Sequence, residues 1–144
     1  MKKCFSIIIT SILLSSLIMF SVNAQNIIKF GNKITIKEET KVSDVLKEPK
    51  KYLEKNILVE GTILNVSAKD GCWLKVSSDK KYQTFIIKAN KDEMSFPLDS
   101  VGKKVRAEGK IYFNSFKEHK GCLYKELNGV ESYMLKPASV EILN

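Results

Sequence analysis

Apolar and polar residues alternate along most of the chain after residue 56, and this pattern predicts a mainly β domain. Successive side chains of a strand point to opposite faces, so a half-buried strand carries apolar residues at every second position. The pattern predicts strands at 33–37, 57–66, 72–78, 82–89, 103–113 and 131–143, the last being one strand or a pair broken at Pro137. Residues 90–101 and 114–130 lack the alternation and are expected to be loops with short helical turns at most.

A short helix is predicted at the start of the domain, which we expect to span 42–144. Ser43 is the expected N-cap of a helix that continues to about Lys47. Pro49 cannot lie inside a regular helix, so a turn and a second helical turn through Tyr52 should follow.

Two of the predicted strands carry a glycine near their middle, within similar sequences. Residues 54–63, EKNILVEGTI, are similar to residues 102–111, GKKVRAEGKI. A glycine inside a strand permits a bulge or a sharp bend, as small closed barrels require. Three strands, an intervening loop and two further strands follow the order of a five-stranded OB-like β-barrel, and a small open β-sandwich is the alternative.

The alternation also assigns residues to the two faces of each strand. Trp73 is expected to point outward, whereas Cys72 should face the core or its rim. The residues expected to face the core are Ile57, Val59, Gly61, Ile63, Cys72, Leu74, Val76, Phe85, Ile87, Ala89, Val105, Ala107, Gly109, Ile111 and Phe113.

The first 24 residues have the anatomy of a secretory signal peptide. Two lysines follow Met1, an apolar run covers 5–20, and VNA at 22–24 supplies the small residues of a cleavage site before Gln25. An uncleaved membrane anchor is the alternative, but the run is short for a bilayer span, and no later stretch is long enough. We therefore expect cleavage, a periplasmic or secreted protein, and a lead-in segment at 25–41.

The chain is basic, with 24 lysine and arginine residues against 16 acidic ones and a formal net charge of +8. Excess lysine favours anionic partners such as phospholipid, surface polysaccharide or nucleic acid, although a solvated lysine-rich surface is the alternative. Arg106 is the only arginine. Proteins that read nucleic acid usually use more arginine, so nucleic acid is the weaker of these partners.

Two long stretches resemble a family of small exported bacterial OB-fold proteins of unknown function. They are residues 46–76, LKEPKKYLEKNILVEGTILNVSAKDGCWLKV, and residues 101–113, VGKKVRAEGKIYF, within a resemblance that covers 42–113. The matching residues are Pro49, Tyr52, Gly61, Gly71, Cys72 and Trp73. Where the family has a second cysteine in the Gly-Cys-Trp turn, this chain has Ser67, and His119 would correspond to a downstream histidine. The resemblance implies the OB fold and export but no established activity.

Cys72 and Cys122 remain after signal cleavage, and three interpretations of them stay open. They could form a disulfide, which an oxidising compartment permits and which would stabilise the domain by roughly 4 kcal/mol. Cys72 could instead be a small buried hydrophobic residue. In the third interpretation both cysteines and His119 bind copper or zinc, with Met94 or Met134 as a fourth ligand.

Catalysis is not predicted, because the sequence contains one histidine, no glycine-rich phosphate loop and no outstanding carboxylate pair. The function that we expect is a non-catalytic binding module for a small ligand, glycan or envelope protein. Its predicted binding surface consists of Trp73, Lys75, Tyr82 and Tyr112. The alternative is an envelope protein that handles metal or thiols through Cys72, His119 and Cys122.

Overall fold

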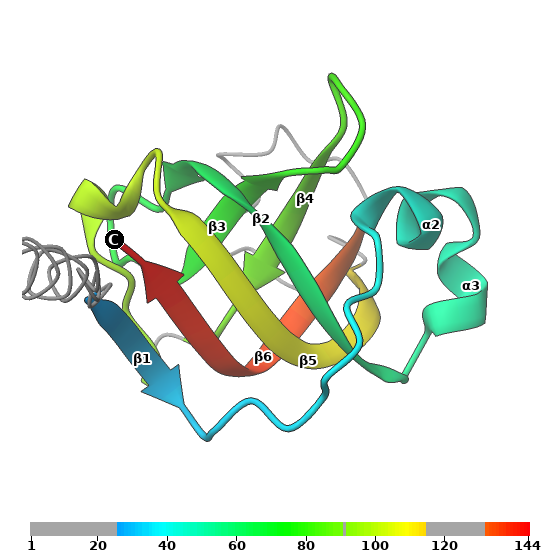
Figure 1. Ribbon diagram of the computed structural model, residues 1–144, viewed down its shortest axis with the longest axis horizontal. Coiled ribbons are helices and arrows are strands. Elements are labelled where there is room, and N and C mark those ends of the chain that lie inside the picture. The colour runs from blue at the N-terminus through cyan, green and yellow to red at the C-terminus, as the bar shows by residue number, and fades with distance from the viewer. Residues whose placement is uncertain (1–25, 91, 115–131) are drawn as a thin grey trace, which may run out of the picture.

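The computed structural model describes residues 26–90, 92–114 and 132–144 (Figure 1). His119 and Cys122, together with the predicted signal peptide, lie outside these residues. The elements are β1 (Ile27–Gly31), α2 (Val42–Lys47), α3 (Pro49–Tyr52), β2 (Asn56–Val66), β3 (Trp73–Ser77), β4 (Thr84–Lys88), the 3-10 helix η1 (Leu98–Ser100), β5 (Lys104–Asn114) and β6 (Ser132–Leu143). The strands predicted from residue 57 onward are therefore confirmed, with shifts of one or two residues at their ends.

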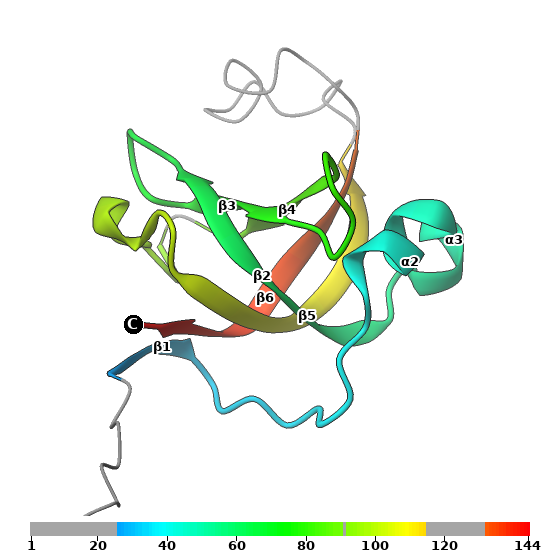
Figure 2. The ribbon, with the colours of Figure 1, turned by 45° about the horizontal axis from the view of Figure 1, so that its top comes forward.

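Five strands close into a β-barrel, which confirms the predicted mainly β class. Around the barrel the order is β2-β3-β4-β6-β5, and β5 pairs with β2 to complete the ring (Figure 2). All of these pairs are antiparallel except β4 with β6, which are parallel and meet where Ile87 lies opposite Leu135.

The prediction of a strand at 33–37 is wrong, and the strand of the lead-in lies earlier, at β1. β1 runs antiparallel to β6, from Ile27 opposite Leu143 to Gly31 opposite Ser139. We name the next residues, 32–41, the N-terminal strap, because they cross the outside of β5 and β2 before α2 begins (Figure 1). The strap alternates in sequence but forms no extended ladder, since its central backbone N–H groups bind a side chain of β5 instead.

The two helical turns separated at Pro49 are confirmed, but the predicted N-cap is wrong. Lys41 occupies the N-cap, and Ser43 lies inside the first turn. The backbone N–H and hydroxyl of Ser43 both donate to the Asp79 carboxylate, at 2.9 and 2.7 Å. Ser43 therefore ties α2 to the turn between β3 and β4 rather than capping the helix.

The mid-strand glycines lie where two backbones approach each other closely. A Cβ on Gly61 would lie 2.5 Å from the carbonyl oxygen of Ser77, beside the point where β2 changes its partner from β5 to β3. A Cβ on Gly109 would collide with the carbonyl oxygen of Lys136 and lie 2.7 Å from Cα of Pro137. β6 is continuous through Pro137, because the register of β5 and β6 shifts at this point and accommodates the proline.

The main core fills the barrel, and most residues predicted to face it are buried there. α2 closes one end of the barrel with Val42 and Val45, and the segment between β4 and β5 closes the other with Met94 and Phe96 (Figure 1). One prediction is wrong at Phe113, which is 44% exposed at the end of β5 and packs its ring against Tyr133.

Cys72 lies just before β3 and is buried, which agrees with the prediction that it faces the core or its rim. It belongs to a second, smaller cluster with Trp73, Ile86 and Met134, against which Tyr112 packs.

Candidate functional site

One part of the outward surface, formed by β3, β4, the first half of β6 and the second half of β5, carries lysine as its only charged residue type. The outward positions in this part are Trp73, Lys75 and Ser77 in β3; Thr84, Ile86 and Lys88 in β4; Ser132, Met134 and Lys136 in β6; and Lys110, Tyr112 and Asn114 in β5. We name this surface the lysine face, after Lys75, Lys88, Lys110 and Lys136. None of these twelve positions is acidic.

Three of the four lysines occupy neighbouring places in adjacent strands. Lys110 lies directly opposite Lys136 in the β5–β6 pair, and both side chains are exposed. Lys136 follows Leu135 and Lys88 follows Ile87, and these two preceding residues form the pair that joins β6 to β4. Like charges directly opposite each other destabilise a sheet, so this row is unfavourable for folding alone.

On the other side of the barrel, the basic residues of β5 form ion pairs within the chain. Lys104 contacts Glu60 at 3.5 Å, and Arg106 lies 3.4 Å from Glu39 of the strap and 3.8 Å from Glu141. Among the residues that the structure describes, no carboxylate forms an ion pair with any lysine of the lysine face. Lysines without an ion pair also occur elsewhere among the described residues, so what distinguishes the lysine face is that none of its twelve outward positions is acidic.

Two residues of the predicted binding surface, Trp73 and Tyr112, pack in or against the smaller apolar cluster. Trp73 is 3% exposed, so its ring packs in the cluster and is not presented to solvent. The Tyr112 hydroxyl donates to the sulfur of Met134 at 3.7 Å. Burial, and secondly the nearby Cys72, raise the pKa of Tyr112 to about 12, which keeps its hydroxyl protonated at neutral pH.

Of the other two predicted residues, Lys75 borders that cluster and Tyr82 lies apart from it. Lys75 is half-buried and pairs with Ile86 across β3 and β4. Tyr82 is fully exposed in the turn between the same strands, with a positive φ of 63°. The structure thus brings Trp73 and Tyr112 together but does not bring Tyr82 to them.

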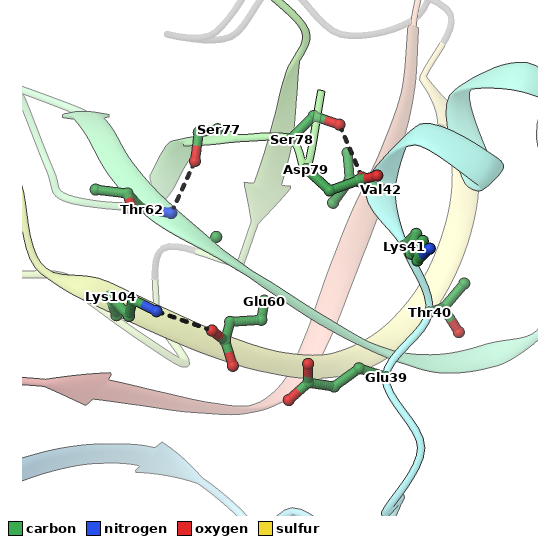
Figure 3. A pocket seen from close by; sticks show the side chains of 11 residues that line it. Glu39, Thr40, Lys41, Val42, Glu60, Thr62, Ser77, Ser78, Asp79 and Lys104 are labelled. Atoms are coloured by element: carbon green, nitrogen blue, oxygen red, sulfur yellow. Dashed lines mark hydrogen bonds and ion pairs between the residues drawn. The ribbon is translucent and has the colours of Figure 1, made fainter. Parts of the chain in front are cut away.

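A hollow of about 260 Å³ lies between the end of the strap, β2 and the turn after β3 (Figure 3). Its acidic groups already have partners in the chain. Figure 3 shows Lys104 reaching Glu60, and the Asp79 carboxylate accepts both bonds from Ser43. These bonds from the Ser43 hydroxyl and backbone N–H lower the pKa of Asp79 to about 2, so it stays ionised at neutral pH. The carboxylates of the hollow are therefore engaged in contacts within the chain.

A second hollow, of about 670 Å³, lies under the strap beside Arg106 and Glu141. The strap is fixed there by Glu108, a residue that is 5% exposed. One oxygen accepts from the backbone N–H groups of Thr35 and Ile36 at 2.5 and 2.9 Å. The other accepts from the Thr35 hydroxyl at 2.9 Å and the Asn56 amide at 3.3 Å. Glu108 is thus a structural anchor of the strap.

The predicted metal ligands cannot be assembled from the part of the chain that the structure describes. Within 26–90, 92–114 and 132–144, no group of three or more histidine, cysteine or acidic residues is placed to hold a metal ion. The proposed pairing of Cys72 with Cys122 or His119 lies partly outside these ranges and stays a prediction. Of the proposed fourth ligands, Met134 lies in the cluster with Cys72, whereas Met94 packs in the main core.

Sequence reasoning missed three residues of the candidate site, namely Lys88, Lys110 and Lys136. Their outward positions could be read from the alternation, since each lies next to a core residue of its strand. That these lysines gather on one face could not be read from the sequence, because it depends on β6 lying between β4 and β5.

None of the described residues forms a helix long and apolar enough to cross a bilayer. A scan against models of known protein families finds no match, and a search of curated proteins finds none either.

Proposed function

We propose that the chain is an exported, non-catalytic binding module of the OB type that holds its ligand on the lysine face. The strand order supports the OB assignment. With β2 as the first barrel strand, the ring runs first, second, third, fifth, fourth, and the third and fifth strands are parallel. OB barrels bind ligands on the face of their second and third strands, which correspond here to β3 and β4.

The observation that carries the proposal is the gathering of four lysines on the lysine face, where none of the twelve outward positions is acidic. Four strands contribute lysines to it, and no described carboxylate pairs with them. Elsewhere on the barrel the basic residues of β5 have acidic partners in the chain. A ligand that brings negative charge would supply the missing partners, so we propose that the ligand is acidic.

The export part of the proposal rests on the predicted signal peptide, residues 1–24, and on the resemblance to small exported proteins. Protein recovered from outside the cytoplasm of a bacterial host should begin at Gln25 when its N-terminus is sequenced. Full-length protein that stays in the cytoplasm would contradict this part alone.

The binding part is tested by mapping backbone-amide NMR shifts during titration with heparin, using neutral dextran as the control ligand. Heparin should perturb amides of β3, β4, β6 and the second half of β5, and dextran should perturb none. A variant with glutamine at Lys75, Lys88, Lys110 and Lys136 should lose the perturbation. Shifts confined to the hollow near Asp79, or no shifts with heparin, would refute the assignment of the site.

Metal or thiol handling is the second candidate function, and one observation favours it. Cys72 and Met134 lie in the same buried cluster, which places two sulfur atoms near each other. Thiolate and thioether suit copper(I), and thiolate with imidazole suits zinc. Thiol titration of unreduced protein and metal analysis should then find reactive thiols and about one bound ion. Protein without titratable thiols or metal would exclude this function.

A further inference from the structure

We infer that the ligand of the lysine face is an acidic polysaccharide, bound through charges on several successive sugar units. The inference rests on the proposed function, because it names the ligand class of the same face.

The spread of the lysines favours a polymer over a small anion. Neighbouring strands lie about 4.8 Å apart, so the row of Lys110, Lys136 and Lys88 extends over roughly 10 Å at the backbone. Lys75 lies one strand farther, opposite Ile86. A single carboxylate or phosphate reaches one or two of these ammonium groups. A chain that carries a charge on each unit matches lysines spread over four strands better than a single small anion does.

Single-stranded nucleic acid binds proteins largely by stacking its bases on exposed aromatic side chains. The described outward positions of the lysine face present no exposed ring, and Tyr82, which is fully exposed, lies in the turn beyond β3 and not on the face. Among the described outward positions of this face, the aromatic residues are Trp73, which is buried, and Tyr112, which is half-buried against Met134. Charge is therefore what the face offers, rather than stacking.

The apolar residues of the face also disfavour a membrane surface as the partner. Ile86 is 7% exposed and Met134 is 0% exposed, so neither can insert into a bilayer. Firm peripheral binding usually combines basic residues with apolar insertion or a lipid anchor. The ammonium group of lysine is a point charge without the planar fork of arginine. It therefore suits carboxylate, sulfate or phosphate groups that are spaced along a flexible chain.

The experiment measures the affinity of the mature chain for oligogalacturonates of increasing length by isothermal titration calorimetry. Affinity should rise at least tenfold from the monomer to the length that reaches all four lysines, then level off, and it should fall steeply with added salt. The comparison ligands are a neutral oligosaccharide of equal length, a single-stranded oligonucleotide of equal charge, and vesicles of anionic phospholipid. Each should bind at least tenfold more weakly than the longest oligogalacturonate.

Charge reversal at the cross-strand pair provides the sharpest variant. Lys136→Glu places a carboxylate opposite Lys110, which should weaken oligogalacturonate binding at least tenfold while raising the unfolding midpoint by about 2 °C. A merely structural role would not move binding and stability in opposite directions. The matched control carries Lys50→Glu, an exposed α3 residue outside the face, and should bind within twofold of the wild type. If Lys136→Glu fails to fold, Lys136→Gln provides the same comparison without a new charge.

The outcomes separate the inference from the proposed function. If the oligonucleotide or the vesicles bind more tightly than the oligogalacturonates, and Lys136→Glu abolishes that binding, the ligand class is wrong but the face is correct. Equal affinity for monomer and oligomer also overturns the inference. If no ligand binds, or if the Lys50→Glu control weakens binding as much as Lys136→Glu does, both the inference and the proposed function fail.

Discussion

Replacing Glu108 by glutamine tests whether one buried carboxylate holds the N-terminal strap. The two oxygens of Glu108 accept four hydrogen bonds, two at each oxygen. Glutamine has the same shape but only one oxygen, so it can satisfy one pair of donors and must turn its NH₂ group toward the other pair.

The expected loss follows from the bonds that glutamine cannot make. Hydrogen bonds to charged groups contribute about 1.5–3 kcal/mol each, and a buried donor without a partner costs about 1–3 kcal/mol. Thr35 is exposed, so water can replace part of what is lost on that side. We therefore expect Glu108→Gln to lower the free energy of unfolding by about 2 kcal/mol, which corresponds to about 8 °C in the midpoint for a domain of this size.

The assay combines thermal unfolding with hydrogen exchange. In Glu108→Gln the amides of Thr35 and Ile36 should lose protection, because their acceptor is the Glu108 carboxylate. Glu60→Gln, on the neighbouring β2, is the matched control. It removes a partly exposed ion pair with Lys104 and should cost less than about 0.5 kcal/mol. Equal losses in both variants, or unchanged exchange at Thr35 and Ile36, would refute the assignment of Glu108 as the anchor.

The same anchor predicts a pH dependence. Burial alone would raise the pKa of Glu108, but hydrogen bonds from Ile36, Thr35 and Asn56 outweigh it and hold the pKa below its usual value. A carboxyl whose pKa is lowered by folding stabilises the folded state above its unfolded pKa. That stabilisation is lost as the pH falls through the folded pKa. The stability difference between wild type and Glu108→Gln should therefore be constant near neutral pH and shrink below about pH 4.

Three further predictions concern single side chains. Gly109→Ala would drive a Cβ into the backbone of β6 and should lower the free energy of unfolding in urea by about 3 kcal/mol or more. Gly102→Ala is the control, at φ +87° in open space, and should lower it by about 1 kcal/mol. Equal losses in the two variants would contradict the close approach of β5 and β6 at Gly109. The pKa of Asp79 is lowered to about 2, so its contribution to the free energy of unfolding should be present above pH 4 and lost between about pH 4 and 2. After allowance for solvent screening, Asp79→Asn should lower the free energy of unfolding by about 1 kcal/mol at pH 7. Equal stabilities of Asp79→Asn and wild type at pH 7 would contradict this role of Asp79. The pKa of Tyr112 is raised to about 12, so in an absorbance titration this tyrosine should ionise at higher pH than the unperturbed ones, and Tyr112→Phe should remove that ionisation step. Folding favours the neutral phenol, so the free energy of unfolding should fall as the pH rises above about 10.

The barrel strands could be predicted from the sequence because the alternation is a local signal. Core residues recur at every second position of β2, β4 and β5, and their burial follows directly. Pro49 likewise separates α2 from α3 by a local steric effect. The central glycines could also be predicted from the sequence. The backbone atoms that approach them closely, such as the carbonyl oxygen of Lys136 at Gly109, belong to strands distant in the sequence.

The strap could not be predicted, because its conformation is decided by residues far along the chain. KITIK alternates as a strand does, yet two of its N–H groups bind Glu108, more than 70 residues away. β4 pairs with β6 only at Leu135, which leaves the same edge of β6 open farther along the strand. β1, in the lead-in, pairs with that edge from Ser139 to Leu143. Ser43 was mispredicted for the same reason, because its backbone N–H and hydroxyl donate to Asp79, 36 residues along the chain, and Ser43 does not cap its own helix.

Trp73 shows why the candidate surface was harder to predict than the fold. Alternation assigns a side chain to a face, and Trp73 does point away from the barrel interior. Whether an outward side chain is exposed depends on its neighbours from other strands, here Ile86 of β4 and Met134 of β6. The large aromatic ring that suggested a binding surface is therefore packed, and the exposed chemistry of the same face comes from lysines.

The course of β5 explains why that chemistry is concentrated on one part of the barrel. Along its outward positions, Lys104 is paired with Glu60, Arg106 with Glu39 and Glu141, and Glu108 with the strap. After Gly109 no described carboxylate forms an ion pair with β5, and Lys110 lies directly opposite Lys136 instead. One strand thus stabilises the fold with its first half and exposes charge with its second. Because the described outward positions of the lysine face hold four lysines and no acidic residue, the partner that we propose for this face is one that carries the opposite charge.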